Sequence, residues 1–244
     1  SPCEYRICER NGIDNKQIIL SGVYKNKDDV RRVMAKKTQP IYTIESMRHL
    51  HLLNDLSLEL NQKIQVLIRL TSGNQFGMDE ESIESIFKTR MVYPNITFVG
   101  IQMYSGTQKT RKRKFEKELH KMETFMTHLE ERYGLDLPIL EFGPGLAVSY
   151  FEEKAEDSLQ DLADVLEELN SQRHISLEIG RYMVASCGDY VSKVVDIKQN
   201  LEKNYAILDG GIHHVNYFGQ FLGMKHPLIS HYPVSDEDKD ESLW

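Results

Sequence analysis

The stretch Ile64-Gln65-Val66-Leu67-Ile68-Arg69-Leu70 has the apolar, β-branched character of a buried β-strand, and residues 96–103 form a second such run. Between them, residues 81–89 carry apolar side chains at helical spacing. A strand, a helix and another strand in direct succession are typical of parallel strands joined by a crossover helix. This unit therefore predicts an α/β fold.

The same alternation continues on both sides of this unit. Further strands are predicted at residues 18–20, 41–44, 139–142 and 175–179, and further helices at residues 27–36, 46–58, 111–133 and 157–170. Six parallel strands fit either a (β/α)8 barrel or a doubly wound sheet.

The residues at the strand ends favour the barrel. Polar or small residues follow or end four of the strands, namely Arg69, Tyr104, Gly143 and Glu178. In a TIM-like barrel all these ends meet at one mouth, where active sites lie. A doubly wound dinucleotide domain would carry Gly-x-Gly-x-x-Gly after its first strand, and the sequence has no such turn.

Both ends of the sequence depart from a complete barrel. Residues 1–4 resemble a loop into a helix at residues 4–11, so we expect the first two barrel strands to be missing. After Arg181, β-rich runs at residues 190–197 and 205–208 follow without an intervening helix, which indicates an antiparallel β segment. We therefore predict a partial barrel at residues 1–185 and the beginning of a C-terminal β domain at residues 186–244.

The composition of the sequence argues against several classes of binding partner. Hydrophobic residues make up 40% and charged residues 27%, an ordinary globular balance, and the net charge of -7 argues against nucleic-acid binding. The spacing of Cys3, Cys8 and Cys187 suits neither a disulfide framework nor a zinc site, and we expect no metal. No apolar run reaches the roughly 18 residues of a membrane span. We expect a cytoplasmic protein that binds neither membrane nor nucleic acid.

Four segments at strand ends carry the chemistry. In Glu178-Ile179-Gly180-Arg181, the guanidinium suits a phosphate group and the carboxylate could hold a protonated ring nitrogen. Taken alone, Glu178 and Arg181 could also form a structural ion pair. The other segments are Tyr104-Ser105-Gly106-Thr107, Glu141-Phe142-Gly143-Pro144-Gly145 and Asp209-Gly210-Gly211. Taken alone, the Gly143-Pro144-Gly145 part of the second segment could be only a tight turn.

In this order, the segments resemble the fold-type-III pyridoxal-phosphate-dependent decarboxylases, the family of diaminopimelate and ornithine decarboxylases. Residues 178–182 are similar to the family's Glu-Pro-Gly-Arg-Tyr, with Ile179 in place of proline. Residues 100–107 stand where the family has Gly-Leu-His-Phe-His-Val-Gly-Ser. Similar pieces are Ser21-Gly22-Val23-Tyr24-Lys25, Leu67 to Leu70, Gln75 to Met78, and Val194 to Lys198.

The resemblance implies pyridoxal 5′-phosphate as cofactor and a role for each matching residue. Glu178 would pair with the pyridine nitrogen, and Tyr104 would stack on the ring in place of a histidine. The phosphate would be held by Thr107, Gly143, Gly145, Gly180 and Arg181, with Ile179 inside the same motif. Glu4 would lie near the cofactor's imine, Arg69 near the ring, and Asp209 near the substrate.

The resemblance also implies an activity and an assembly. We expect a homodimeric carboxy-lyase that decarboxylates an amino acid or an amino-acid derivative. The family's Schiff-base lysine lies on the first barrel strand, so residues 1–244 by themselves are expected to be inactive, and Lys25 is not its substitute. No arginine follows Asp209, which argues against diaminopimelate as substrate. An amino-acid racemase on the same barrel and a non-catalytic cofactor-binding homologue are the alternatives.

Overall fold

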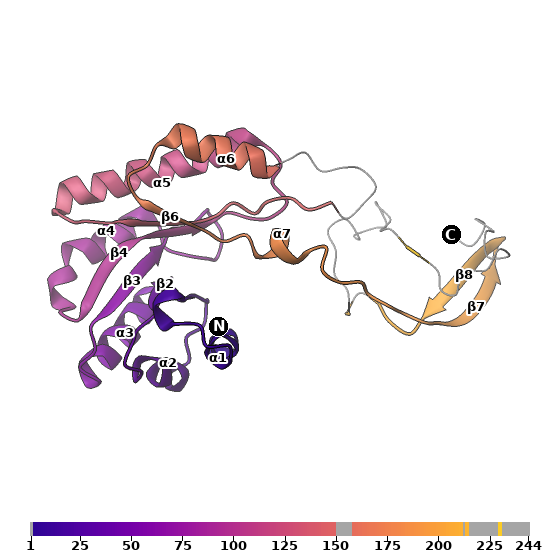
Figure 1. Ribbon diagram of the computed structural model, residues 1–244, viewed down its shortest axis with the longest axis horizontal. Coiled ribbons are helices and arrows are strands. Elements are labelled where there is room, and N and C mark those ends of the chain that lie inside the picture. Colours follow the sequence, from indigo (N-terminus) through magenta and orange to yellow (C-terminus); the bar gives the residue numbers. More distant parts are fainter. Residues whose placement is uncertain (1, 150–157, 212, 215–228, 231–244) are drawn as a thin grey trace. The chain divides into compact units, whose positions relative to one another are not determined.

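The structure is a computed structural model that describes residues 2–149, 158–211, 213–214 and 229–230. The chain forms two compact units. The first comprises residues 1–146 and 157–179, and the second comprises residues 147–156 and 180–244. Figure 1 labels the helices and strands of both.

The first unit contains a six-stranded sheet in the order β1-β2-β3-β4-β5-β6, and every neighbouring pair of strands is parallel. The strands are β1 (Ile19–Leu20), β2 (Ile41–Ile44), β3 (Ile64–Arg69), β4 (Ile96–Tyr104), β5 (Ile139–Gly143) and β6 (His174–Leu177). The helices are α1 (Pro2–Arg10), α2 (Lys27–Met34), α3 (Met47–Glu59), α4 (Glu80–Lys88), α5 (Lys112–Tyr133) and α6 (Ser158–Leu169). Short 3-10 turns lie at Asn15–Gln17 and Arg90–Val92.

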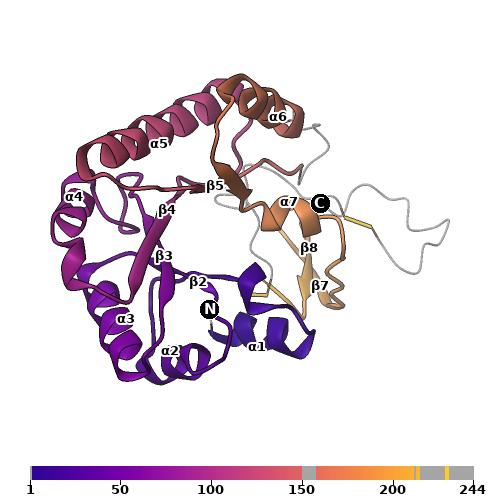
Figure 2. The same cartoon turned by 60° about the vertical axis from the view of Figure 1, so that its left-hand side comes forward.

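The sheet is curled, and Figure 2 shows helices α2 to α6 around its outer side. This arrangement confirms the predicted TIM-like barrel for the six strands, which form a half-barrel. Element boundaries differ from the prediction by a few residues at most. The largest difference within the sheet is at β6, which ends at Leu177, although the Glu178 backbone N–H still donates to the Phe142 carbonyl at 2.9 Å.

Polar side chains fix where the helices begin. The side chain of Asn26 accepts hydrogen bonds from the backbone N–H groups at the start of α2, and Ser46 and Asp79 do the same for α3 and α4. At the other end of α5, Gly134 takes the left-handed conformation that closes a helix. These side-chain caps fix where the loops after β1, β2 and β3 end.

Gly100 allows two central strands to approach each other closely. The β3–β4 register shifts between Val66 and Leu67, which leaves one extra residue in β4 just before Gly100. A Cβ atom at Gly100 would lie 1.7 Å from the carbonyl oxygen of Ile139 at the start of β5. Only glycine therefore fits at this position without moving a strand.

Gly100→Ala is expected to lower the free energy of unfolding by about 2–3 kcal/mol, because the new methyl group overlaps rigid backbone. Urea denaturation followed by circular dichroism measures this loss. Gly188→Ala is the matched control, since nothing lies within 4 Å of the Cβ position there. Equal stability of the two variants would show that β5 can move aside.

The second unit contains an antiparallel hairpin, as predicted for the residues after Arg181. Helix α7 (Gly180–Val184) precedes β7 (Val194–Asn200) and β8 (Lys203–Leu208). Leu201 and Glu202 join the strands with φ angles of 47° and 64°, the left-handed backbone of a two-residue hairpin turn. Strand β7 begins at Val194, later than the predicted residue 190.

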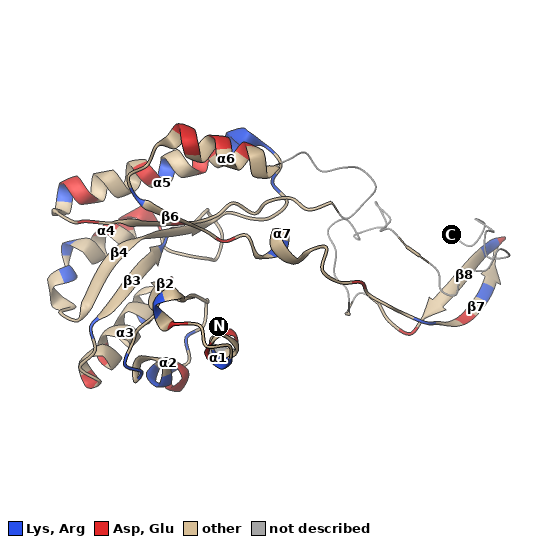
Figure 3. Ribbon diagram, viewed as in Figure 1, with Lys and Arg blue, Asp and Glu red and all other residues tan. Residues whose placement is uncertain are grey.

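The outer helices of the first unit carry positive and negative side chains in alternation (Figure 3). Several of these charges link neighbouring helices. Lys112 on α5 contacts Glu168 on α6 at 2.7 Å, and Lys121 contacts Glu80 on α4 at 3.0 Å. None of the helices in the described part of the chain is long and apolar enough to cross a membrane.

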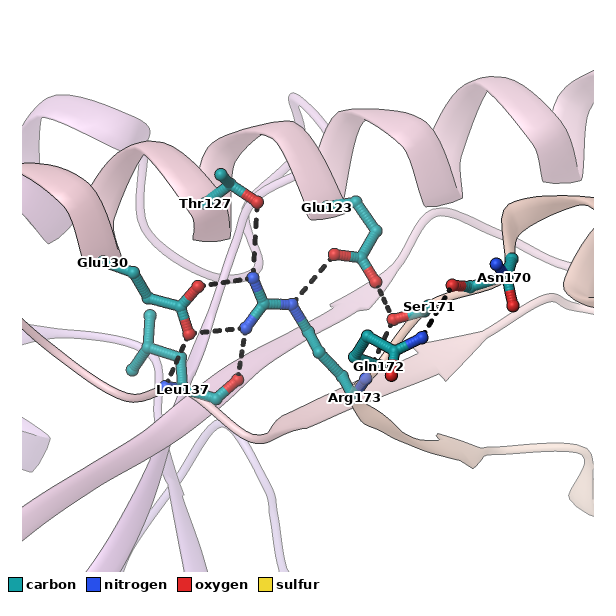
Figure 4. Close-up of polar contacts among 8 residues, drawn as sticks. All are labelled: Glu123, Thr127, Glu130, Leu137, Asn170, Ser171, Gln172 and Arg173. Atoms are coloured by element: carbon teal, nitrogen blue, oxygen red, sulfur yellow. Dashed lines mark hydrogen bonds and ion pairs between the residues drawn. The ribbon is translucent and has the colours of Figure 1, made fainter.

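An arginine just before β6 joins the sheet to α5 (Figure 4). Arg173 contacts Glu123 through Nε at 2.9 Å and Glu130 through Nη1 at 2.6 Å. It also donates to the Leu137 carbonyl at 2.7 Å, just before β5. The two carboxylates raise the pKa of Arg173 and keep it charged. This cluster lies at the amino-terminal ends of the strands, opposite the predicted mouth.

Candidate functional site

A row of polar side chains crosses the carboxyl-terminal ends of the strands. Arg69 on β3 is in register with Gln102 on β4, and Gln102 is in register with Glu141 on β5. Register partners on parallel strands project from the same face of a sheet, so these side chains are neighbours. Glu178 follows β6, and its carboxylate accepts a hydrogen bond from Gln102 Nε2 at 2.9 Å.

Glu141 and Glu178 form a carboxyl pair at this mouth. Glu141 is almost fully buried, and its carboxyl group is hydrogen-bonded to that of Glu178. Burial, followed by the negative charge of Glu178 and this hydrogen bond, raises the pKa of Glu141 to about 9, while Arg69 acts in the opposite direction. A hydrogen bond between two carboxyl groups requires a proton on one of them, and the burial of Glu141 favours its protonated form.

Arg69 is held by an ion pair and an aromatic ring. Its Nη1 lies 3.1 Å from Glu45 Oε2, and both side chains are largely buried. Glu45 directly follows β2, in the same way that Glu178 follows β6. The Arg69 guanidinium also lies over the Phe76 ring, 4.9 Å from its centroid. The orientation of the Arg69 guanidinium group at the end of β3 is therefore fixed.

A lysine and a histidine lie around Glu45. The Glu45 backbone N–H donates to Nδ1 of the buried His49 at 3.3 Å. Burial, followed by the charge of Lys25, lowers the pKa of His49 and favours its neutral form. Burial also lowers the pKa of Lys25 to about 8, with Glu45 acting against this shift, and Lys25 Nζ donates to the Gly22 carbonyl at 3.0 Å.

The loops after β4 and β5 pack backbone against backbone. A Cβ atom at Gly145, whose φ is 62°, would lie 1.8 Å from the Gly106 carbonyl oxygen and 3.0 Å from Thr107 Cα. A Cβ atom at Gly143 would lie 2.5 Å from the ring of Tyr104. Both glycines are therefore required by close contacts. Tyr104, which is predicted to stack on the ring, and the predicted phosphate-binding residues Thr107, Gly143 and Gly145 are brought together here.

A buried lysine anchors the loop that carries Thr107. The Lys109 backbone N–H donates to the Gly145 carbonyl at 2.9 Å, which ties this loop to the β5 loop. Its Nζ pairs with Glu118 on α5 at 2.7 Å and also donates to Ser105. Because the ammonium group is neutralised by Glu118, its role in this structure is to hold the loop.

Other predicted site residues are less closely connected to this row. Glu4 lies exposed in the first turn of α1. Ile179 ends the first unit, whereas Gly180 and Arg181 begin α7 in the second. Asp209, also in the second unit, accepts hydrogen bonds from Ser192 Oγ and the Lys193 backbone N–H, both at 2.9 Å. The functional roles of these residues remain predictions.

The polar row contains residues that the sequence analysis did not assign. Gln102, Glu141 and Glu45 are polar residues inside or directly after apolar strands, and this pattern could have identified them. In the described part of the chain, no hydrogen-bond partner reaches the buried atoms Glu45 Oε1, Gln102 Oε1 and Glu141 Oε2. Buried polar atoms without partners at a strand-end mouth indicate a place for a polar ligand. No group of metal-ligating side chains was found among the described residues.

Comparison with known families gives a match over the whole of the first unit and part of the second. A family model described as "Pyridoxal-dependent decarboxylase, pyridoxal binding domain" matches residues 1–185. The chain is also 26% identical to a diaminopimelate decarboxylase of Aquifex aeolicus over 226 residues, covering 86% of this chain and 53% of the relative. It is 25% identical to an L-glutamyl-[BtrI acyl-carrier protein] decarboxylase of Niallia circulans, covering 98% of this chain and 61% of the relative.

Solved structures agree on the fold. The crystal structure of AQ1208 from Aquifex aeolicus matches with a TM-score of 0.79 and 26% identity, covering 87% of this chain and 52% of that one. A lysine/ornithine decarboxylase from Vibrio vulnificus, complexed with putrescine, matches with a TM-score of 0.75 and 23% identity, covering 87% and 58%. The chain thus spans between half and about three fifths of the length of these relatives.

Proposed function

The chain belongs to the family of pyridoxal-dependent decarboxylases, and we propose that the protein uses pyridoxal 5′-phosphate to remove the α-carboxylate of an amino acid or an amino-acid derivative. The observation that carries the proposal is the family match over residues 1–185, which includes every strand-end residue of the polar row. The relatives reported above that are named for an activity are decarboxylases, which favours this reaction over racemisation.

The residues at the mouth fit this cofactor. Pyridoxal 5′-phosphate has a basic ring nitrogen, a ring hydroxyl and an anionic phosphate. The carboxyl pair offers a negative partner for a protonated nitrogen. The buried atoms Glu45 Oε1 and Gln102 Oε1 have no partner among the described residues and can accept hydrogen bonds from a ligand. The close contacts at Gly143 and Gly145 hold the loops after β4 and β5 against each other, and the proposed phosphate site lies on these two loops.

Each residue then has a physical task. Glu178 would hold the proton on the ring nitrogen, Arg69 would lie near the ring, and the Tyr104 ring would offer it an apolar face. The phosphate would be bound by Thr107, Gly143, Gly145, Gly180 and Arg181, with Ile179 inside the same motif. When bound, the cofactor supplies a conjugated ring that accepts the electron pair released by loss of the carboxylate.

The proposal extends to substrate and assembly. Asp209 would lie close to the substrate, and Glu4 would lie near the cofactor. One relative is named for a glutamyl group on an acyl-carrier protein, so the substrate class includes free and carrier-bound amino acids. We further propose a cytoplasmic homodimer in which residues 186–244 begin the C-terminal β domain.

The function is tested on protein expressed from its complete coding region. Addition of pyridoxal 5′-phosphate is expected to give the visible absorbance of a protein-bound cofactor, and a screen of amino acids is expected to give carbon dioxide release. Inversion of configuration without carbon dioxide would indicate a racemase. Cofactor absorbance without turnover of free or carrier-bound amino acids would indicate a non-catalytic homologue.

Arg181→Ala is expected to weaken the affinity for pyridoxal 5′-phosphate by about 10- to 100-fold, since a charge-assisted hydrogen bond to the phosphate is lost. Equilibrium dialysis measures the dissociation constant. Arg113→Ala, at an exposed position on α5, is the matched control and should bind the cofactor as the wild type does. If both variants bound the cofactor equally well, Arg181 would have no role in phosphate binding.

A further inference from the structure

We propose that Glu141 is a positioning residue that donates a hydrogen bond to Glu178 and thereby holds the Glu178 carboxylate toward the cofactor's ring nitrogen. The inference rests on the proposed function, because it assigns Glu178 to the ring nitrogen. The proposal assigns a role to Glu141, which lies outside the motif at residues 178–182 that contains Glu178.

The geometry places Glu141 as a support for Glu178. Residues 102 and 141 are register partners on adjacent strands, and Glu178 follows the next strand. The Glu178 backbone N–H donates to Phe142, the residue after Glu141, at 2.9 Å. The Glu178 carboxylate receives one hydrogen bond from Gln102 Nε2 at 2.9 Å and contacts the Glu141 carboxyl group. Its direction is therefore set by two neighbouring side chains.

Charge and burial determine which of the two acids carries a proton. Glu141 is only 4% exposed, whereas Glu178 is half-buried and closer to solvent. The charged groups that act on Glu141 are Glu178 after β6, which disfavours its ionisation, and Arg69 on β3, which favours it. Gln102 on β4 is neutral, and Glu45 after β2 is paired with Arg69. Two adjacent carboxylates with one partly neutralised cation do not both ionise in a buried site.

The consequence for the cofactor follows from the position of the carboxylate. Gln102 and protonated Glu141 both donate to Glu178, so its remaining lone pairs are available to a protonated ring nitrogen. Without the Glu141 donor, the carboxylate is held by Gln102 alone and can turn away from the ring. The ring then loses part of the negative partner that keeps it protonated and is a poorer electron acceptor.

The decisive comparison is between Glu141→Gln and Glu141→Leu, because glutamine keeps a neutral donor of the same length and leucine removes it. Glu141→Gln is expected to bind pyridoxal 5′-phosphate within about threefold of the wild type, and Glu141→Leu about tenfold more weakly. The nitrogen-15 shift of isotopically labelled, bound cofactor is expected to report a protonated ring in the wild type and Glu141→Gln, and partial loss of the proton in Glu141→Leu. Glu116→Gln, exposed on α5, is the matched control.

A second measurement needs no cofactor. The folded-state pKa of Glu141 is raised to about 9 from 4.5, so between these values the folded protein holds a proton that the unfolded chain has lost. Stability therefore falls as pH rises through this window. Glutamine cannot ionise, so the melting temperature of Glu141→Gln minus that of the wild type is expected to increase from pH 5 to pH 8. A constant difference would overturn the proton assignment.

The outcomes separate the two proposals. If the wild type does not bind pyridoxal 5′-phosphate, the proposed function fails and the role of Glu141 at the ring fails with it. If the wild type binds and Glu141→Gln equals Glu141→Leu in affinity and nitrogen-15 shift, only the present inference fails. If both variants bound the cofactor more weakly than the wild type to the same degree, an ionised Glu141 would be required. If both kept the wild-type affinity, the Glu141 side chain would only fill space.

Discussion

Replacing Glu178 by glutamine is expected to lower kcat for decarboxylation by about 100- to 1000-fold, the range seen when one preorganised electrostatic group is removed from an active site. The amide is neutral and cannot hold a proton on the ring nitrogen, so the ring accepts the electron pair less readily. The hydrogen bond from Gln102 and the contact with Glu141 show that the structure fixes this carboxylate in place.

The cofactor affinity of Glu178→Gln should fall much less than kcat, because the phosphate is bound by other residues. Steady-state kinetics on protein from the complete coding region and a parallel cofactor titration measure the two effects. Glu116→Gln, the same change at an exposed position on α5, should leave both near the wild-type values. A Glu178→Gln variant with wild-type kcat would remove this residue from the mechanism.

Arg173→Met is expected to lower the free energy of unfolding by about 3 kcal/mol, which is at the low end for breaking a buried ion pair because both carboxylates keep some solvent. The arginine side chain is 11% exposed, and it joins Glu123, Glu130 and the Leu137 carbonyl (Figure 4). Methionine fills much of the volume but leaves these groups without their cation.

Urea denaturation at several pH values tests the role of Arg173. Arg173 lowers the pKa of Glu130, so its contribution is present above the ordinary glutamate pKa of 4.5 and is lost as pH falls through the lowered value. The stability difference between wild type and Arg173→Met should therefore shrink in acid. Arg132→Met, which breaks an exposed pair with Glu84, should lose less than about 1 kcal/mol. Equal losses in the two variants would contradict the special role of Arg173.

These two sites illustrate a division between the ends of the half-barrel. Arg173 precedes β6 and affects stability, whereas Glu178 follows β6 and is assigned to chemistry. In barrels of this type, residues at the carboxyl-terminal strand ends act on ligands, and those at the opposite ends hold the fold. The short strand β6 thus separates two clusters with different tasks.

The order of strands and helices could be predicted from sequence because apolar periodicity distinguishes short buried strands from amphipathic helices. All six strands of the sheet and the later hairpin occur where such runs lie. The exact ends were less predictable. Tyr104 and Gly143 extend β4 and β5 beyond the apolar runs, because these two residues are themselves register partners that continue the ladder.

The sequence by itself also predicted the segments that we propose bind the cofactor, since residues 100–107 and 178–182 are local segments whose residue types can be compared directly with a family. It placed Glu141 in one of the strand-end segments but gave it no role in the site. Only the tertiary structure places residue 141 in register with Gln102 and against Glu178, which is 37 positions further along the chain. A buried carboxyl group becomes a hydrogen-bond donor only when desolvation and a neighbouring negative charge raise its pKa, and both arise from packing between strands rather than from local sequence.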